Sequence, residues 1–212
     1  MNVLAIDTAS PDAAVVFLSG GRILEEALPA ERRASEELLP AIRRVLDRAG
    51  AGLEDCSRIA VCAGPGSFTG VRVGLATAWG LARAAGIPIE AVSTLEALAE
   101  TARGVSERVL AVLDAGRGDV VCAEFALGGG RAEPIGETRR LPADRVRQLA
   151  GGDTAVAALP ADLLGPADPI ARPRPAAALA RAVAAHPGAD AASLEAIYSR
   201  PSAAEEKRGV AP

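Results

Sequence analysis

Apolar residues recur along the chain in two stretches that resemble each other at a distance of about half its length. Residues 3–7 and 109–114 are short apolar runs that end on an aspartate, a pattern typical of buried β-strands. A polar turn and a second apolar run follow each of them. Both second runs lead into a Gly-Gly-Arg turn, at residues 20–22 and 129–131, and then into a third strand. The pattern predicts an internal duplication.

The remaining periodicity completes two units with the element order βββαβα. In the first half, helices alternate with strands at residues 35–49, 58–63, 69–85, 89–92 and 94–102. The second half is a shorter copy, with a helix over 143–149, a strand over 154–158, a proline-rich connection and a helix over 176–185. We predict an α/β fold with two related lobes and a cleft between them. The expected boundaries are 1–103 and 104–200, with Gly104 as the hinge and a flexible tail over 201–212.

The helix predicted over residues 35–49 has one apolar and one charged face. Ser35 is a suitable N-cap, and Glu36 follows it at the positive end of the helix dipole. Gly50 ends the helix. We expect the apolar face to be buried, either in the core or against a partner. It comprises Leu38, Leu39, Ile42, Val45 and Leu46.

The helix predicted over residues 71–85 is apolar on nearly every side, with Arg72 and Arg83 as its only charges. A helix of this kind is usually covered all round, and its own sheet covers one side only. A partner subunit or burial beneath the helix at 35–49 can each supply the remaining cover. Trp79 is the candidate anchor for a partner. The other candidate contacts are Val71, Leu75, Ala78 and Ala82.

Composition restricts the kinds of partner. The chain has 212 residues, 50% of them hydrophobic, which is enough to bury a sizeable core. Its 23 basic and 27 acidic side chains give a net charge of −4, too little positive charge for unaided binding to nucleic acid or an anionic membrane. The uncharged run at 59–71 is too short to span a bilayer, and the first residues lack a basic leader. We expect a cytoplasmic protein with no membrane association.

The side chains available for catalysis are few. The chain has one histidine, His186, in a predicted turn after a helix, and one lysine, Lys207. Its three cysteines fit neither a disulfide framework nor a metal motif, so we expect reduced, buried thiols. They are Cys56, Cys62 and Cys122. No histidine-pair metal site can be built from this stock, and we predict neither catalytic residues nor a metal site.

A glycine-rich turn at residues 64–70 follows a predicted strand and opens a helix, a position at which free N–H groups suit an anion. It is not a Walker A loop, because the Gly-Lys-Ser/Thr ending is absent. A second interpretation is a dinucleotide-binding turn, with Glu90 near the ribose. A third is that the glycines only allow a tight turn and close helix packing. All three stay open.

Asp7 and Asp114, which close the two first strands, admit two interpretations. Paired carboxylates across a cleft can hold a metal or a nucleotide. Aspartates at such positions also cap turns by bonding to nearby N–H groups. The candidate nucleotide- or anion-binding residues are Asp7, Thr8, Gly64, Gly66, Ser67, Thr69 and Arg72.

Several motifs together resemble the TsaB family, also called YeaZ. The longest covers residues 64–76 and begins Gly-Pro-Gly-Ser-Phe-Thr-Gly-Val-Arg. Supporting motifs and weaker echoes extend the resemblance over most of the chain. They lie at residues 5–8, 35–40, 86–88, 92–99, 114–120 and 196–201.

The resemblance implies a two-lobed, ribonuclease H-like fold of the actin, sugar-kinase and Hsp70 ATPase type. It also implies a non-catalytic scaffold for TsaD, which transfers a threonylcarbamoyl group to adenosine 37 of tRNAs that read ANN codons. Family members pair with TsaD through the helices at 35–49 and 71–85, and homodimerise by the same surface when alone. The implied complex includes the ATPase TsaE. The family chain has no intrinsic cofactor, but ATP or ADP is expected at the interface of the complex. The chain is expected to contact tRNA only as part of this complex.

The chain departs from the family pattern at Ala34, where relatives often have histidine. Relatives have been labelled glycoproteases or M22 peptidases, but this chain lacks the metal-binding histidine pair of TsaD. Two alternatives to a scaffold remain: a nucleotide-binding enzyme that uses the turn at 64–70, and an M22-type peptidase. Whether Arg72 or Arg117 contacts tRNA is left open.

Overall fold

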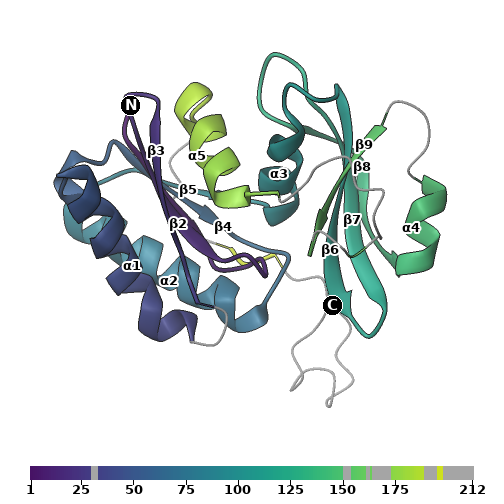
Figure 1. Cartoon of the computed structure of the whole chain (residues 1–212), viewed down its shortest axis with the longest axis horizontal. Coiled ribbons are helices and arrows are strands. Elements are labelled where there is room, and N and C mark those ends of the chain that lie inside the picture. Colours follow the sequence, from purple (N-terminus) through teal and green to yellow (C-terminus); the bar gives the residue numbers. More distant parts are fainter. Residues whose placement is uncertain (30–32, 150–153, 161–162, 164–172, 189–194, 198–212) are drawn as a thin grey trace.

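The computed structural model describes residues 1–29, 33–149, 154–160, 163, 173–188 and 195–197. In these ranges the chain forms two lobes, each built on one β-sheet (Figure 1). The predicted tail at 201–212 and much of the proline-rich connection, including Pro166 and Pro169, lie outside the described residues.

The sheet of the first lobe has the order β3-β2-β1-β4-β5. Its central strand β1 is antiparallel to β2 and parallel to β4. Every residue of β1 is buried, as expected for a strand that reads as a continuous apolar run. The strands are β1 (Val3–Asp7), β2 (Ala14–Ser19), β3 (Arg22–Ala27), β4 (Arg58–Cys62) and β5 (Ile89–Val92).

The second sheet repeats this plan with one strand fewer, in the order β8-β7-β6-β9. β6 pairs with β7 antiparallel and with β9 parallel, as β1 does with β2 and β4. The predicted duplication and the shorter second copy are confirmed. The strands are β6 (Arg108–Gly116), β7 (Asp119–Ala126), β8 (Glu133–Pro142) and β9 (Thr154–Leu159).

Helices α1 (Ala34–Ala49) and α2 (Phe68–Ala85) lie side by side on one face of the first sheet (Figure 1). Gly50 ends α1 in the left-handed conformation, as predicted. The predicted N-cap is wrong, because α1 begins one residue before Ser35 and Arg33 occupies the cap without a side-chain bond. Ser67 caps α2 by accepting the Gly70 N–H, and the helix begins at Phe68, one residue before the helical pattern predicted over 69–85.

The lobes exchange helices. Helix α3 (Thr94–Ala99), from the first half of the chain, packs on the second sheet together with the 3-10 helix Glu100–Ala102. Helix α5 (Pro175–Ala185), from the second half, packs on the first sheet. The spatial division of the chain therefore differs from the boundary expected at residue 103. Helix α4 (Ala143–Leu149) covers the other face of the second sheet (Figure 1).

Two further predictions concern polar side chains. The three cysteines are buried and free. His186 is exposed at the C-terminal cap of α5, in the predicted turn.

None of the helices in the described ranges is long and apolar enough to cross a bilayer.

Candidate functional site

The glycine turn at residues 64–70 packs against the segment that follows β1. The Ser67 N–H donates to the Ala9 carbonyl at 2.8 Å, and the Thr8 hydroxyl donates to the Gly70 carbonyl at 2.6 Å. Because Gly70 lies in the first turn of α2, these bonds join the carboxyl end of β1 to the amino end of α2. The turn is thus a tertiary contact within the first lobe.

Close backbone approach explains two glycines of this turn. A Cβ atom on Gly70 would overlap the Thr8 carbonyl, and one on Gly66 would overlap the Ala9 carbonyl. Two N–H groups of the turn are also already engaged, since that of Ser67 donates to Ala9 and that of Gly70 donates to the Ser67 hydroxyl at 3.2 Å. Of the three interpretations, close packing explains these glycines without a phosphate.

Gly64 is buried beneath the last described segment of the chain. The Ile197 N–H donates to the Ala63 carbonyl at 2.7 Å, and a Cβ atom on Gly64 would overlap the Ile197 carbonyl. The Gly64 carbonyl accepts the Thr94 N–H at 2.7 Å, which ties the turn to α3. Gly64 has a φ of +98°, which favours glycine. The backbone of Gly64 therefore contacts other segments of this chain, at Thr94 and Ile197.

Asp7 is fully buried and caps the turn that follows β1. Its carboxylate accepts the N–H groups of Ala9 and Ser10 at 2.9 and 3.1 Å, and the Ser10 hydroxyl at 2.5 Å. Burial raises the pKa of Asp7, while these hydrogen bonds lower it. Thr8 is only 3% exposed. Neither side chain has surface with which to contact a nucleotide, which corrects the expectation for Asp7 and Thr8.

Asp114 also caps a turn. It is exposed, and its carboxylate accepts the Gly116 N–H at 2.8 Å. The prediction that its strand ends there is wrong, because β6 continues through a register shift to Gly116. Among the other candidate ligands, Thr69 and Arg72 are exposed, and the Arg72 guanidinium lies 3.7 Å from the centre of the Phe68 ring. A nucleotide or anion near this pair stays a prediction.

The candidate partner contacts on α1 and α2 divide sharply by exposure. Eight are 0–8% exposed and fill the space between the helices and the first sheet. Their burial corrects the expectation that they touch a partner, because an apolar stripe that covers its own sheet has no surface left. They are Leu38, Ile42, Val45, Leu46, Val71, Leu75, Ala78 and Ala82.

Leu39 and Trp79 remain available. Leu39 is 57% exposed. Trp79 is half-buried against the core, and the Arg83 guanidinium lies 5.1 Å from the centre of its ring. We define the outer face of α1 and α2 by its solvent-accessible side chains. They are Leu39, Pro40, Arg43, Arg72, Ala76, Trp79, Gly80 and Arg83.

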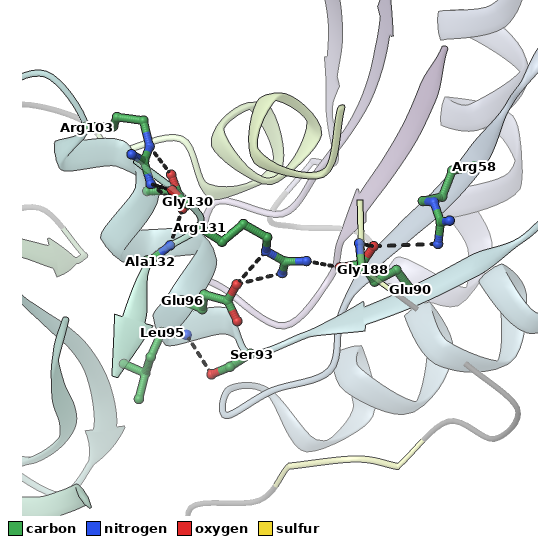
Figure 2. Close-up of polar contacts among 11 residues, drawn as sticks. Arg58, Glu90, Ser93, Leu95, Glu96, Arg103, Gly130, Arg131, Ala132 and Gly188 are labelled. Carbon is green, nitrogen blue, oxygen red and sulfur yellow. Dashed lines mark hydrogen bonds and ion pairs between the residues drawn. The ribbon is translucent and has the colours of Figure 1, made fainter. Parts of the chain in front are cut away.

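A cluster of ion pairs between the lobes was not predicted from the sequence. Glu90, in β5 of the first lobe, lies close to Arg131 and Arg58, and Arg131 also reaches Glu96 of α3 (Figure 2). The interpretation of Glu90 as a ribose ligand is therefore wrong, since its carboxylate bonds within the chain. The one available signal was an acid inside the apolar strand at 89–92.

Two cavities lie away from the predicted nucleotide residues. One, of about 490 Å³, runs along α5, and two arginines on its wall are paired, Arg103 with Glu100 and Arg174 with Glu25. The second, of about 320 Å³, lies beside Asn2. In the described ranges, no group of three or more histidine, cysteine or acidic side chains is placed to hold a metal ion.

Three features define the structural class of this chain. The sheet is duplicated, each central strand is antiparallel to one neighbour and parallel to the other, and the lobes exchange helices. The chain has the two-lobed fold of the actin, sugar-kinase and Hsp70 ATPase group. A family model described as TsaD, tRNA N6-adenosine threonylcarbamoyltransferase, matches residues 28–161.

The similarity becomes more specific among individual proteins. YeaZ from Pseudomonas aeruginosa has a solved structure that is 31% identical, with a TM-score of 0.73, over 93% of this chain and 99% of that one. The tRNA threonylcarbamoyladenosine biosynthesis protein TsaB of Escherichia coli is 39% identical over 59% of this chain. The Bacillus subtilis protein of the same name is 34% identical over 64%. This chain belongs to the TsaB (YeaZ) family.

The matched region is not the whole of those curated relatives. The alignments cover 55% of the Escherichia coli protein and 59% of the Bacillus subtilis protein. The sequence match is therefore concentrated in a little over half of their length, whereas the structural match to the Pseudomonas aeruginosa protein extends over nearly all of it.

Proposed function

We propose that this chain is a non-catalytic subunit in the synthesis of threonylcarbamoyladenosine in tRNA, and that it binds a TsaD-like transferase through the outer face of α1 and α2. The transferase modifies adenosine 37 of tRNAs that read ANN codons. The observation that carries this proposal is the exposure of Leu39 and the partial exposure of Trp79, whereas the other eight candidate contacts on these helices are buried.

The outer face has the properties of a helix-docking surface. Ala76 and Gly80 are exposed one turn apart on α2, and such small residues allow a second helix to approach closely. Leu39 and Trp79 offer apolar area that a partner can bury, and tryptophan is common among residues that dominate binding energy. Arg43 adds positive charge at the edge, where an acidic partner residue can pair with it.

The same face can pair with a second copy when no transferase is present, giving a homodimer in the isolated state. A TsaE-like ATPase completes the proposed complex, with ATP or ADP held at the interface between subunits. The net charge of −4 favours tRNA contact through the complex rather than through this chain alone.

The proposed absence of catalysis is supported by how the chain uses its polar groups. Asp7 and Thr8, which end β1, are engaged in turn and helix contacts. The one histidine, His186, lies exposed at the end of α5. Among the described residues, these placements put no exposed base beside a nucleophile around the glycine turn.

Size-exclusion chromatography with light scattering tests the proposal. The chain is measured alone and mixed with the TsaD-like protein of the same organism at micromolar concentration. We expect the mixture to give a 1:1 complex in place of the homodimer. Independent elution of the two proteins, with and without ATP, would contradict the scaffold function while leaving the fold assignment intact.

A further inference from the structure

The turn between β7 and β8 is fixed by polar contacts to the 3-10 helix after α3. Arg103 donates to the carbonyl oxygens of Gly128 and Gly130, each at 2.8 Å. The Ala132 N–H donates to the Glu100 carboxylate at 2.6 Å. These bonds hold the turn on both sides of Arg131, so the position from which its side chain extends is defined.

Arg131 connects two elements that belong to different lobes. Its Nε and Nη2 atoms donate to Glu96 of α3 at 2.9 and 2.6 Å, and its Nη1 donates to Glu90 of β5 (Figure 2). Helix α3 packs on the second sheet, whereas β5 is an edge strand of the first. A planar guanidinium can bond two carboxylates in fixed directions, so this side chain constrains one lobe relative to the other.

The Glu90 carboxylate also contacts two further segments of the chain. It is 5% exposed, and it accepts the Gly188 N–H just beyond α5 at 2.9 Å. Arg58 at the start of β4 lies 3.6 Å away. Within the described part of the chain, the Nε and Nη1 atoms of Arg58 have no hydrogen-bond partner, so this ion pair is a main compensation for that charge.

The cluster is electrically balanced and mostly buried. Burial lowers the pKa of Arg131, and burial together with the Glu100 carboxylate raises the pKa of Glu96 to about 7. Both shifts mean that burial disfavours the charged forms of these two side chains. Three cations face three acids: Arg58, Arg103 and Arg131 against Glu90, Glu96 and Glu100.

Among the described residues, the other contacts between the lobes include the Thr94 N–H bond to the Gly64 carbonyl and a largely apolar helix packing. Helix α5 packs against α3 and against the 3-10 helix, mostly through small alanine side chains. Packed helices can slide past one another by small amounts, and such a contact alone does not fix an angle. Directional hydrogen bonds from Arg131 can do so.

We propose that Arg131 is a latch that sets the angle between the two lobes. It acts as a positioning residue, holding β5 of the first lobe against α3 of the second. The latch makes the chain a single rigid body, in which α1 and α2 have one orientation relative to the second sheet. This inference does not depend on the proposed partner and applies to the isolated chain.

A distance measurement between spin labels tests the latch. Asp47→Cys on α1 and Glu137→Cys on β8 place labels at exposed positions on opposite lobes. All three native thiols are buried and shielded from the label, and burial also raises their pKa, that of Cys56 to about 11. Pulsed electron paramagnetic resonance then reports the distribution of lobe-to-lobe distances.

We expect a single narrow distribution in the parent and a broad or two-component distribution in Arg131→Met. The matched control is Arg108→Met, which removes the 2.7 Å ion pair with Glu124 inside the second sheet and should leave the distribution narrow. An unchanged distribution in Arg131→Met, or equal broadening in the control, would overturn the proposal.

Arg131→Lys decides the matter if Arg131→Met does not fold. Lysine keeps the charge but cannot bond both carboxylates in the directions of the guanidinium fork. We expect this variant to fold and to broaden the distance distribution. A distribution as narrow as that of the parent would show that a charge suffices and that no directional latch exists.

Discussion

The Thr8 hydroxyl donates a 2.6 Å hydrogen bond to the Gly70 carbonyl and thereby joins the end of β1 to the first turn of α2. Gly74, one turn further along α2, also lies close to this hydroxyl. A Cβ atom on Gly74 would overlap the Thr8 Oγ1. This contact places α2 on the sheet at close range. The orientation of the outer face therefore depends on residues that the sequence suggested as nucleotide ligands.

Gly70→Ala should lower the free energy of unfolding by about 1–3 kcal/mol, because the added methyl group overlaps the Thr8 carbonyl and the helix must shift. Gly80→Ala is the matched control. Nothing lies within 4 Å of its Cβ position, and removal of a mid-helix glycine should stabilise by about 0.5–1 kcal/mol. Urea unfolding measures both. Equal effects of the two substitutions would show that the close contact is not a constraint.

The pH dependence of stability should report Glu96. Its pKa is raised from 4.5 to about 7 in the folded chain by burial and by Glu100, so the folded state binds more protons than the unfolded state between these values. This contribution is complete below pH 4.5 and is lost as the pH rises through 7. The loss is at most about 3 kcal/mol, because the hydrogen bonds from Arg131 favour the charged form.

Glu96→Gln removes this titration while keeping the shape of the side chain. We expect the free energy of unfolding of the parent to fall more steeply than that of the variant as the pH rises from 4.5 to 7. Guanidinium unfolding at several pH values gives the comparison. Parallel curves would mean that Glu96 is ionised at the same pH in the folded and unfolded chains.

Nucleotides should not stabilise the isolated chain. Asp7 and Thr8 are buried, and the Ser67 hydroxyl accepts the Gly70 N–H, so this end of the turn offers few free groups to a phosphate. Thermal unfolding with ATP, ADP or NAD tests this. A site occupied at a hundred times its Kd would add about 2.7 kcal/mol. A melting temperature that rises with nucleotide concentration would favour the nucleotide-binding enzyme instead.

Local patterns predicted the elements of this fold well. The apolar runs predicted at 3–7 and 58–63 form the largely buried strands β1 and β4, and Gly50 ends its helix in the left-handed conformation. These features depend on neighbours in the sequence. The start of α1 was missed by one residue, because Ser35 is a good cap by type but the backbone turns helical before it.

Long-range packing was beyond the sequence. An apolar stripe shows that a helix face is covered, but not whether the chain's own sheet or a partner covers it, and eight candidate contacts proved to be internal. The exchange of α3 and α5 between lobes also leaves no local signal. Arg131 was noticed only as part of a repeated Gly-Gly-Arg turn, and its pairing with Glu90 spans 41 residues of sequence.

The affinity of Leu39→Glu for the TsaD-like protein tests the central claim most directly. A carboxylate placed in the proposed interface should weaken binding about tenfold or more, ~1.4 kcal/mol, because the charge loses water without gaining a partner. Val105→Glu is the control, since Val105 is 64% exposed and lies outside α1 and α2. We predict weak binding for Leu39→Glu and parental binding for Val105→Glu, with both variants folded by circular dichroism. Parental affinity in a folded Leu39→Glu would contradict docking through this face.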